Sequence, residues 1–222
     1  MATHLDLEEQ EQLDQLKAFW KRYGSLIVWV LVLALAAFVG WTQWNRWQSA
    51  QSQKAGQLYD EIAIAAKEGD LKRTNQILAD LKERYPRALF SHQAALLAAK
   101  VQLDKAKPDE AAASLAWVAE SAPEAEYRTI AKLRLAGVLL DQKKYDEALQ
   151  QLAGADVKEF AGLVADRRGD ILAAQGKAEE AKAAYQQAWA AISPGSEYRN
   201  MVEAKLIVRG VVPSDAASKA SP

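Results

Sequence analysis

The stretch from Tyr23 to Asn45 contains no charged residue, and this limits the possible folds of the chain more than any other feature. As an α-helix, with a rise of 1.5 Å per residue, it would be about 34 Å long, slightly more than the ~30 Å hydrocarbon core of a bilayer. Aromatic rings stand at both ends, as in the interfacial belts of membrane proteins. The sequence therefore predicts a transmembrane helix over residues 23–45, with candidate interface anchors at Tyr23, Trp41, Trp44 and Trp47.

Two other interpretations of the stretch are a cleaved signal peptide and a buried core helix. A signal peptide has a short basic leader, but here a long segment rich in acidic residues comes first, including Asp6, Glu8 and Asp14. The apolar run also exceeds a typical signal-peptide core. A core helix rarely needs such a long uninterrupted apolar run in an otherwise amphipathic chain. We therefore interpret the stretch as an uncleaved anchor.

The basic residues beside the anchor predict its orientation. Lys17, Lys21 and Arg22 precede it, whereas Arg46 and then Lys54 follow it. Because basic flanks stay in the cytoplasm, we expect a cytoplasmic N-terminus and a single membrane pass.

Residues 1–22 precede the anchor as a separate segment. Leu13, Leu16 and Trp20 have helical spacing, so an amphipathic helix is expected over residues 5–22. This helix is either an interfacial extension of the anchor or a docking helix for another membrane protein.

A repeated pattern of short helices follows the anchor. A turn containing GD, KP, KK or GK precedes a small residue, and this small residue recurs every 33 to 37 residues, close to the 34-residue tetratricopeptide period. Leu, Leu, Leu and Tyr stand four residues after it, on the same helix face. Proline ends three of the four units, and Phe160 stands there in the third. The small residues are Thr74, Ala111, Ala148 and Ala181.

This register predicts an all-α fold. We expect a single transmembrane helix followed by a tetratricopeptide-like solenoid of about four helix–turn–helix units over residues 46–211. Twelve residues before each small residue stand Ile62, Ala99, Ala136 and Gly169, where two helices would cross closely. Residues 197–208 read as a capping helix, and residues 212–222 as a flexible tail.

The composition offers little chemistry. A net charge of −1 argues against a nucleic-acid partner, and the absence of cysteine excludes thiolate chemistry and cysteine zinc sites. The two histidines, His4 and His92, lack ligand spacing and are interpreted as surface side chains. No nucleophile elbow or phosphate loop occurs, so no enzyme, metal or cofactor is expected.

Charged side chains cluster at two kinds of place. Acidic pairs stand near the start of the second helix in three of the four units, where they suit the helix dipole: Asp109–Glu110, Asp146–Glu147 and Glu179–Glu180. Asp166, Arg167, Arg168 and Asp170 are interpreted as a solvated network along one helix, with a partner contact as the alternative.

The first helices of the repeats would line a concave groove. Apolar side chains there would suit extended or partly folded polypeptide, or they are simply core between neighbouring repeats. The candidate peptide-groove residues are Leu96, Leu103, Ile130, Leu133, Leu140 and Leu163.

Several longer segments resemble the YfgM family of Gram-negative inner-membrane proteins. They are LKAFWKRYG (16–24), GWTQW (40–44), QLYDEI (57–62), KLRLAGVLLDQKKYDEALQQL (132–152) and VADRRGDILAAQGKAEEAKAAYQQA (164–188). The resemblance implies an ancillary subunit of the SecYEG translocon in the cell inner membrane. It also implies a periplasmic repeat domain that cooperates with the periplasmic chaperone PpiD and has no enzymatic activity. The apolar groove adds unfolded client polypeptides as further candidate partners. The alternative is a scaffold for another envelope machine, such as cytochrome maturation or outer-membrane biogenesis.

Overall fold

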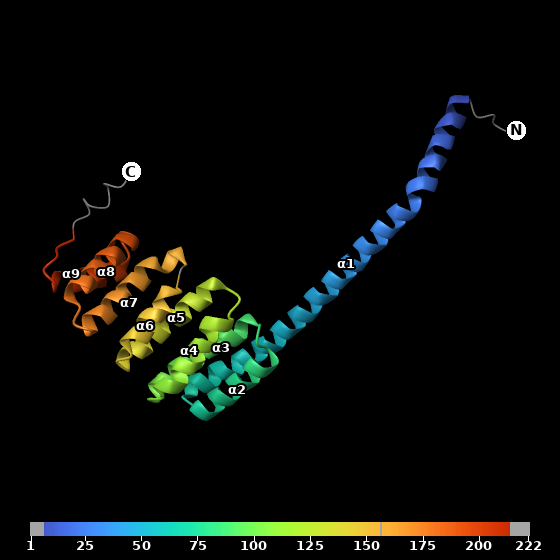
Figure 1. Cartoon of the computed structure of the whole chain (residues 1–222). Coiled ribbons are helices and arrows are strands. Elements are labelled where there is room, and N and C mark those ends of the chain that lie inside the picture. Colours follow the sequence, from blue (N-terminus) through green and yellow to red (C-terminus); the bar gives the residue numbers. More distant parts are fainter. Residues whose placement is uncertain (1–6, 156, 214–222) are drawn as a thin grey trace. The chain divides into compact units, whose positions relative to one another are not determined.

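The computed structural model describes residues 7–155 and 157–213, which form nine α-helices and one short 3₁₀-helix and contain no β-strand (Figure 1). The predicted all-α class is therefore confirmed. The helices are α1 (Leu7–Glu68), α2 (Leu71–Arg84), α3 (Leu89–Asp104), α4 (Pro108–Ser121), α5 (Ala125–Asp141), α6 (Tyr145–Ala153), η1 (Lys158–Phe160), α7 (Ala161–Ala174), α8 (Ala178–Ala191) and α9 (Glu197–Ile207).

The chain divides into two compact units, Met1–Gln51 and Ser52–Pro222. Helix α1 belongs to both units. Its C-terminal part serves as the first helix of the repeats, because Ala55, Ile62 and Ala65 belong to the main core cluster. The amphipathic helix expected over residues 5–22 is part of α1 from Leu7 onwards and is continuous with the apolar stretch that follows it. The tail expected over residues 212–222 lies outside the described residues from position 214.

The second unit consists of helix pairs that follow one another along the chain (Figure 1). The four small residues of the predicted register, Thr74, Ala111, Ala148 and Ala181, are each 0% exposed. Gly169 shows how close the helices come: a Cβ placed there would lie 2.6 Å from the Tyr185 ring. Small residues are therefore needed at these crossings, and the repeat register is confirmed.

Each pair of helices turns through the same backbone conformation. The residue five before the small residue has a positive φ in all four repeats, namely Gly69 (68°), Ala106 (55°), Lys143 (61°) and Gly176 (78°). The next amide donates to a carbonyl five residues earlier, as from Lys177 N to Leu172 O at 3.0 Å. These are Schellman helix ends, which favour glycine at the left-handed position. Two repeats use glycine there and two do not.

The third repeat differs from the others in its second helix. Helix α6 has 9 residues, whereas α2, α4 and α8 each have 14. It ends at Ala153, and the chain continues through Gly154 and Ala155 towards η1. The buried apolar residues also separate here, since one core cluster extends from Ala55 to Ile171 and a second from Leu172 to Leu206.

Helix α9 closes the C-terminal end of the repeats, as predicted for residues 197–208. Val202 and Leu206 are fully buried and belong to the second core cluster with residues of α8. Proline follows α2, α4 and α8 within three residues, at Pro86, Pro123 and Pro194, and ends those helices as expected.

Candidate functional site

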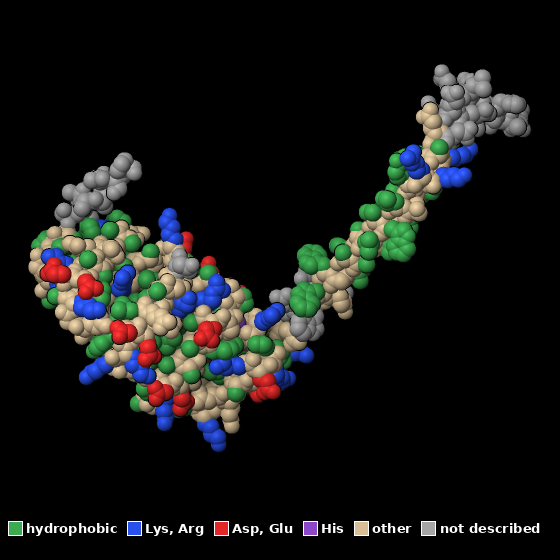
Figure 2. Space-filling model, in the orientation of Figure 1, with side chains coloured by type: hydrophobic (Ala, Val, Ile, Leu, Met, Phe, Trp, Pro, Cys, Tyr) green, Lys and Arg blue, Asp and Glu red, His purple; other side chains and the backbone are tan. Residues whose placement is uncertain are grey.

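The apolar part of α1 is exposed along its length, and Figure 2 shows hydrophobic side chains around it. Residues Gln15–Trp44 are long and apolar enough to cross a membrane, with a mean hydropathy of 2.3 and only 6% of the most apolar window buried. Leu26, Leu33 and Phe38 are each more than 60% exposed. A soluble protein rarely leaves such an apolar surface open to water, so this part of α1 fits a helix that crosses a bilayer.

Aromatic side chains mark both ends of this apolar surface. Tyr23 packs on Phe19 with ring centroids 5.1 Å apart, and the Arg22 guanidinium lies 5.7 Å from the Tyr23 ring centroid. At the other end Trp41 and Trp44 are 64% and 57% exposed. Such positions suit rings that lie at the headgroup level. The fourth expected anchor, Trp47, has a side chain outside the described part of the chain.

The six candidate groove residues do not share one environment. Leu96 is 8% exposed and belongs to the core, so its side chain does not line a groove. Ile130, Leu133 and Leu140 are half-buried and pack against the same core. Leu163 is half-buried, and Leu103 is 42% exposed. The first helices thus present only a partial apolar surface.

The charged cluster of α7 is only partly the solvated network predicted from the sequence. Arg168 is exposed and Arg167 pairs with Asp170 along the helix at 3.8 Å, but Asp166 is buried and bonds to α9. Asp166 is 2% exposed, and both of its carboxylate oxygens lie 2.8 Å from Lys205 Nζ of α9. The Tyr198 hydroxyl donates to Asp166 Oδ2 at 2.6 Å. Lys205 also donates to Asp170 Oδ1 at 2.7 Å, as does the Tyr185 hydroxyl at 2.8 Å. The network joins α7, α8 and α9.

The same network perturbs its tyrosines. Burial, together with a hydrogen bond to a carboxylate, raises the pKa of Tyr185 and of Tyr198 well above the usual value. Both hydroxyls therefore stay protonated and donate throughout the physiological range. Cations also lie over rings of α8, with the Arg199 guanidinium 3.8 Å from the Trp189 ring centroid. These contacts hold α9 against α8, so α9 covers the apolar face of the last repeat.

The second histidine is buried, contrary to the surface position predicted for it. His92 is 0% exposed and stacks on Trp117 of α4, with ring centroids 4.7 Å apart. Its Nδ1 lies 3.1 Å from Ala88 O and its Nε2 3.3 Å from Ser121 Oγ. Burial lowers the pKa of His92, so the neutral ring is favoured. His92 is a structural link between α3 and α4. His4 lies outside the described residues.

Polar side chains join successive repeats at equivalent places. Gln142, just after α5, donates to Asp109 Oδ1 at 2.9 Å, and Gln175, just after α7, donates to Asp146 Oδ1 at 3.2 Å. The accepting residues are the first members of the acidic pairs, which lie in the first turn of α4 and α6 as predicted. Besides complementing the helix dipole, the pairs therefore bind the next repeat. No sequence pattern pointed to the two glutamines.

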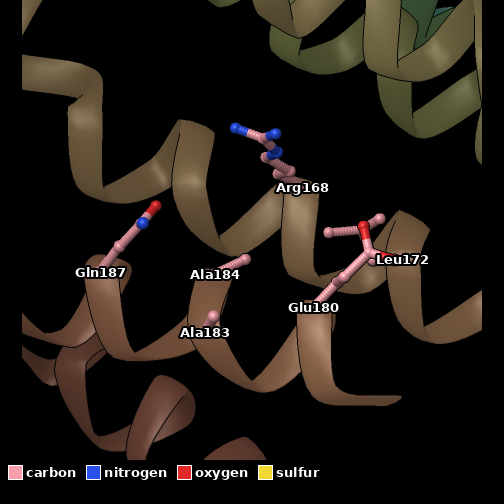
Figure 3. Close-up of a pocket in the computed structure, with 6 residues that line it drawn as sticks. All are labelled: Arg168, Leu172, Glu180, Ala183, Ala184 and Gln187. Carbon is pink, nitrogen blue, oxygen red and sulfur yellow. The ribbon is translucent and has the colours of Figure 1, made fainter. Parts of the chain in front are cut away.

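Two shallow cavities open where α6 is short. The first, of about 200 Å³, is lined by residues of α7 and α8, and the second, of about 250 Å³, extends towards the chain between α6 and α7. Both are lined by Arg168 and Gln187. Figure 3 shows these two side chains extending to the same side of the first cavity, with Ala183 and Ala184 between them. Sequence reasoning did not find this site, because it depends on the length of α6.

Nothing in the described residues suggests metal chemistry. No three His, Asp or Glu side chains of this part of the chain lie together as a metal site would need.

Comparison with known proteins agrees with this architecture. The family described as "Tetratricopeptide repeat-like domain" matches residues 17–208. A Neisseria gonorrhoeae protein named "Ancillary SecYEG translocon subunit" is 35% identical to the chain, over 93% of this chain and 98% of its own length. The match includes the apolar part of α1 as well as the repeats.

Proposed function

This chain belongs to the YfgM family of tetratricopeptide repeat-like proteins, and from this premise we propose that it is an ancillary subunit of the SecYEG translocon. The observation that carries the proposal is the similarity to the gonococcal translocon subunit over almost the full length of both chains. Similarity over such a length covers both the membrane helix and the repeats, which are the two parts that an ancillary membrane subunit needs.

The proposed topology is a single pass through the cell inner membrane. Residues 1–22 lie in the cytoplasm, residues 23–45 cross the bilayer, and the repeats of residues 46–211 lie in the periplasm. The excess of basic residues before the span supports this orientation. Cysteines introduced at Ser49 and Ser218 should react with an impermeant thiol reagent once the outer membrane is permeabilised, and one at Thr3 should not. The reverse labelling would contradict the orientation.

The proposed role is that of a tethered adaptor. The anchor region docks on the translocon, while the repeats bind the periplasmic chaperone PpiD or emerging client polypeptides. A tether makes the second contact effectively intramolecular, so a weak contact made by the repeats is still productive.

Exchange of the anchor tests this division of roles. Replacement of residues 1–47 by an unrelated membrane helix of the same topology should abolish co-purification of SecYEG from gently solubilised membranes. PpiD should still be recovered. A matched control carries the unrelated helix in place of residues 23–45 only, which separates the span from its cytoplasmic flank. Recovery of SecYEG by the variant lacking residues 1–47 would place the docking surface in the repeats instead.

The alternative role, a scaffold for another envelope machine, predicts a different set of partners. The name of the gonococcal relative does not favour it. Cross-linking in intact membranes separates the two roles, since a scaffold for cytochrome maturation or outer-membrane biogenesis would capture those components and not SecYEG.

A further inference from the structure

We propose that the two cavities beside α6 form one binding site for an extended segment of a partner polypeptide that carries an apolar side chain and a carboxylate on the same side. This inference rests on the proposed function, because it names the chemistry of a segment that the adaptor would hold. The proposal follows from the shape of the third repeat, the lining of the cavities and the position of Arg168.

The site exists because one helix is short. Helix α6 lacks five residues relative to α2, α4 and α8, a loss of about 7.5 Å of helix. In a complete repeat, those residues would cover the neighbouring face of α7 and α8. Here the face remains open and forms cavities of about 200 and 250 Å³. Each is smaller than the roughly 300–1,000 Å³ of small-molecule sites, so it fits a side chain better than a cofactor.

The walls of the site are mostly apolar. Leu172 and Ala184 are 5% and 4% exposed and form the floor of the first cavity together with Ala183, which is exposed. The second cavity is lined by Val157, Ala161 and Val164, among others. An apolar side chain of a partner would therefore leave water on entering either cavity, which favours binding.

Arg168 gives the site its charge preference. Its side chain is exposed and lines both cavities, and among the described residues it forms no hydrogen bond or ion pair. It lies on the opposite side of α7 from Asp166 and Asp170, because residues two apart on a helix differ by about 200°. A guanidinium above apolar walls binds a carboxylate with paired, charge-assisted hydrogen bonds. Glu180, at the other end of the first cavity, disfavours an anion there (Figure 3).

The spacing of these groups fits an extended chain. Arg168 and Leu172 are one turn apart on α7, which is about 6 Å along the helix. Residues i and i+2 of a β-like segment point to the same side and lie about 6.6 Å apart. A carboxylate at Arg168 and an apolar side chain over Leu172 would thus come from residues two apart. Gln187, which lies on the side of Arg168 away from Leu172 (Figure 3), can bind the main chain beyond the carboxylate, because its amide both donates and accepts.

A binding measurement on the full chain in detergent micelles tests the site. The probe is a short fluorescein-labelled glycine–serine peptide with leucine and aspartate two positions apart, and binding is followed by fluorescence anisotropy. Arg168→Gln should weaken binding about tenfold, as expected for loss of a charge-assisted hydrogen-bonded pair. Ala183→Trp should abolish it by filling the cavity from an exposed position. The matched control Arg134→Gln, an exposed arginine of α5 outside the cavities, should bind like the unmodified protein.

Control peptides separate this site from general attraction to a basic surface. A peptide with asparagine in place of aspartate should bind the unmodified protein about tenfold more weakly than the aspartate peptide does. The Arg168→Gln variant should bind the two peptides equally. Equal affinity of the two peptides for the unmodified protein, or equal effects of Arg168→Gln and Arg134→Gln, would overturn the proposal. A far-ultraviolet circular dichroism spectrum identical to that of the unmodified protein shows that each variant is folded.

The outcome is independent of the proposed role at the translocon. If peptide binding fails while SecYEG still co-purifies, the site is wrong and the adaptor role stands. If SecYEG does not co-purify with the unmodified protein, the adaptor role is wrong, whatever the peptide shows.

Discussion

Replacement of Lys205 by methionine tests whether the buried network of α7 and α9 holds the C-terminal cap in place. The Lys205 ammonium lies 2.8 Å from both oxygens of Asp166 and 2.7 Å from Asp170 Oδ1. Methionine has a similar length and keeps the apolar contacts, but it cannot donate. Asp166, which is 2% exposed, would then keep only the Tyr198 hydroxyl as a donor.

The expected cost follows from this burial. Removal of one partner from a fully buried ion pair costs about 3–5 kcal/mol, because the other charge stays buried without compensation. The Lys205 side chain is 27% exposed, so water already weakens the pair, and we expect about 2–3 kcal/mol. For a domain of this size, each kcal/mol lowers Tm by about 2–4 °C. Lys205→Met should therefore lower Tm by about 4–12 °C.

Thermal unfolding of the full chain in detergent micelles, followed by circular dichroism, measures this shift. Lys182→Met is the matched control. Its ammonium lies 3.9 Å from Glu179, whose side chain is 89% exposed, so its loss should cost no more than about 0.5 kcal/mol. Asp166→Asn combined with Lys205→Met should recover part of the loss, since no buried charge remains. Equal Tm values for the Lys205 and Lys182 variants would refute the reasoning.

Three further predictions concern the repeats. Ala148→Leu should overpack the helix crossing at a fully buried site and lower the free energy of unfolding by about 1–3 kcal/mol in urea denaturation. The control Gln150→Leu, on the exposed face of α6, should change it by no more than about 0.5 kcal/mol. Equal effects would mean that the repeat register is wrong. Gly176→Ala should lower the free energy of unfolding by about 1 kcal/mol, because alanine is strained at the φ of 78° found there. Ala106→Gly, at a φ of 55°, should be neutral or stabilising, and a stabilising Gly176→Ala would contradict the turn geometry. Burial lowers the pKa of His92 below its usual 6.5, so as the pH falls the unfolded chain takes up a proton before the folded chain does. The contribution of His92 to stability should therefore be full above about pH 6.5 and should fall as the pH decreases towards the pKa of the folded state. In urea denaturation at a series of pH values, His92→Gln should reduce this slope, and an unchanged slope would exclude His92 as its source.

The repeat register could be predicted from the sequence because it is set by local sterics. A helix crossing admits only a small side chain, so Thr74, Ala111, Ala148 and Ala181 reveal the crossings without knowledge of any partner. The apolar span of α1 is equally local, since its length and lack of charge suffice to recognise it.

Two features that sequence analysis missed depend on partners far along the chain. Asp166 binds Lys205 and Tyr198, which are 39 and 32 residues away in a cap outside the repeat pattern. On α7 alone, Asp166 and Asp170 read as ordinary charges of a solvated helix. His92 similarly lacks a local signal, because the ring that covers it, Trp117, comes from the next helix.

The length of α6 escaped prediction for a different reason. Ala155 stands seven residues after Ala148 and fits the helix face of the other repeats. It is indeed buried, at 9% exposed, but it lies beyond the end of α6 at Ala153. Periodicity alone cannot distinguish a residue of the helix from a buried residue of the turn that follows it. The cavities beside α6 were therefore invisible to the pattern that located the repeats.

Helix α7 separates its structural contacts from its candidate binding surface. One side carries Asp166 and Asp170, which tie it to the cap, and the opposite side carries Arg168 above the cavities. Because no hydrogen bond or ion pair among the described residues joins the two sides, a change on one should not disturb the other. Arg168→Gln should then alter peptide binding with little effect on Tm, and combination with Lys205→Met should give the sum of the separate changes in stability. A sum that fails by more than about 0.5 kcal/mol would show that α7 transmits strain across its width, and the binding site could then no longer be treated as independent of the cap.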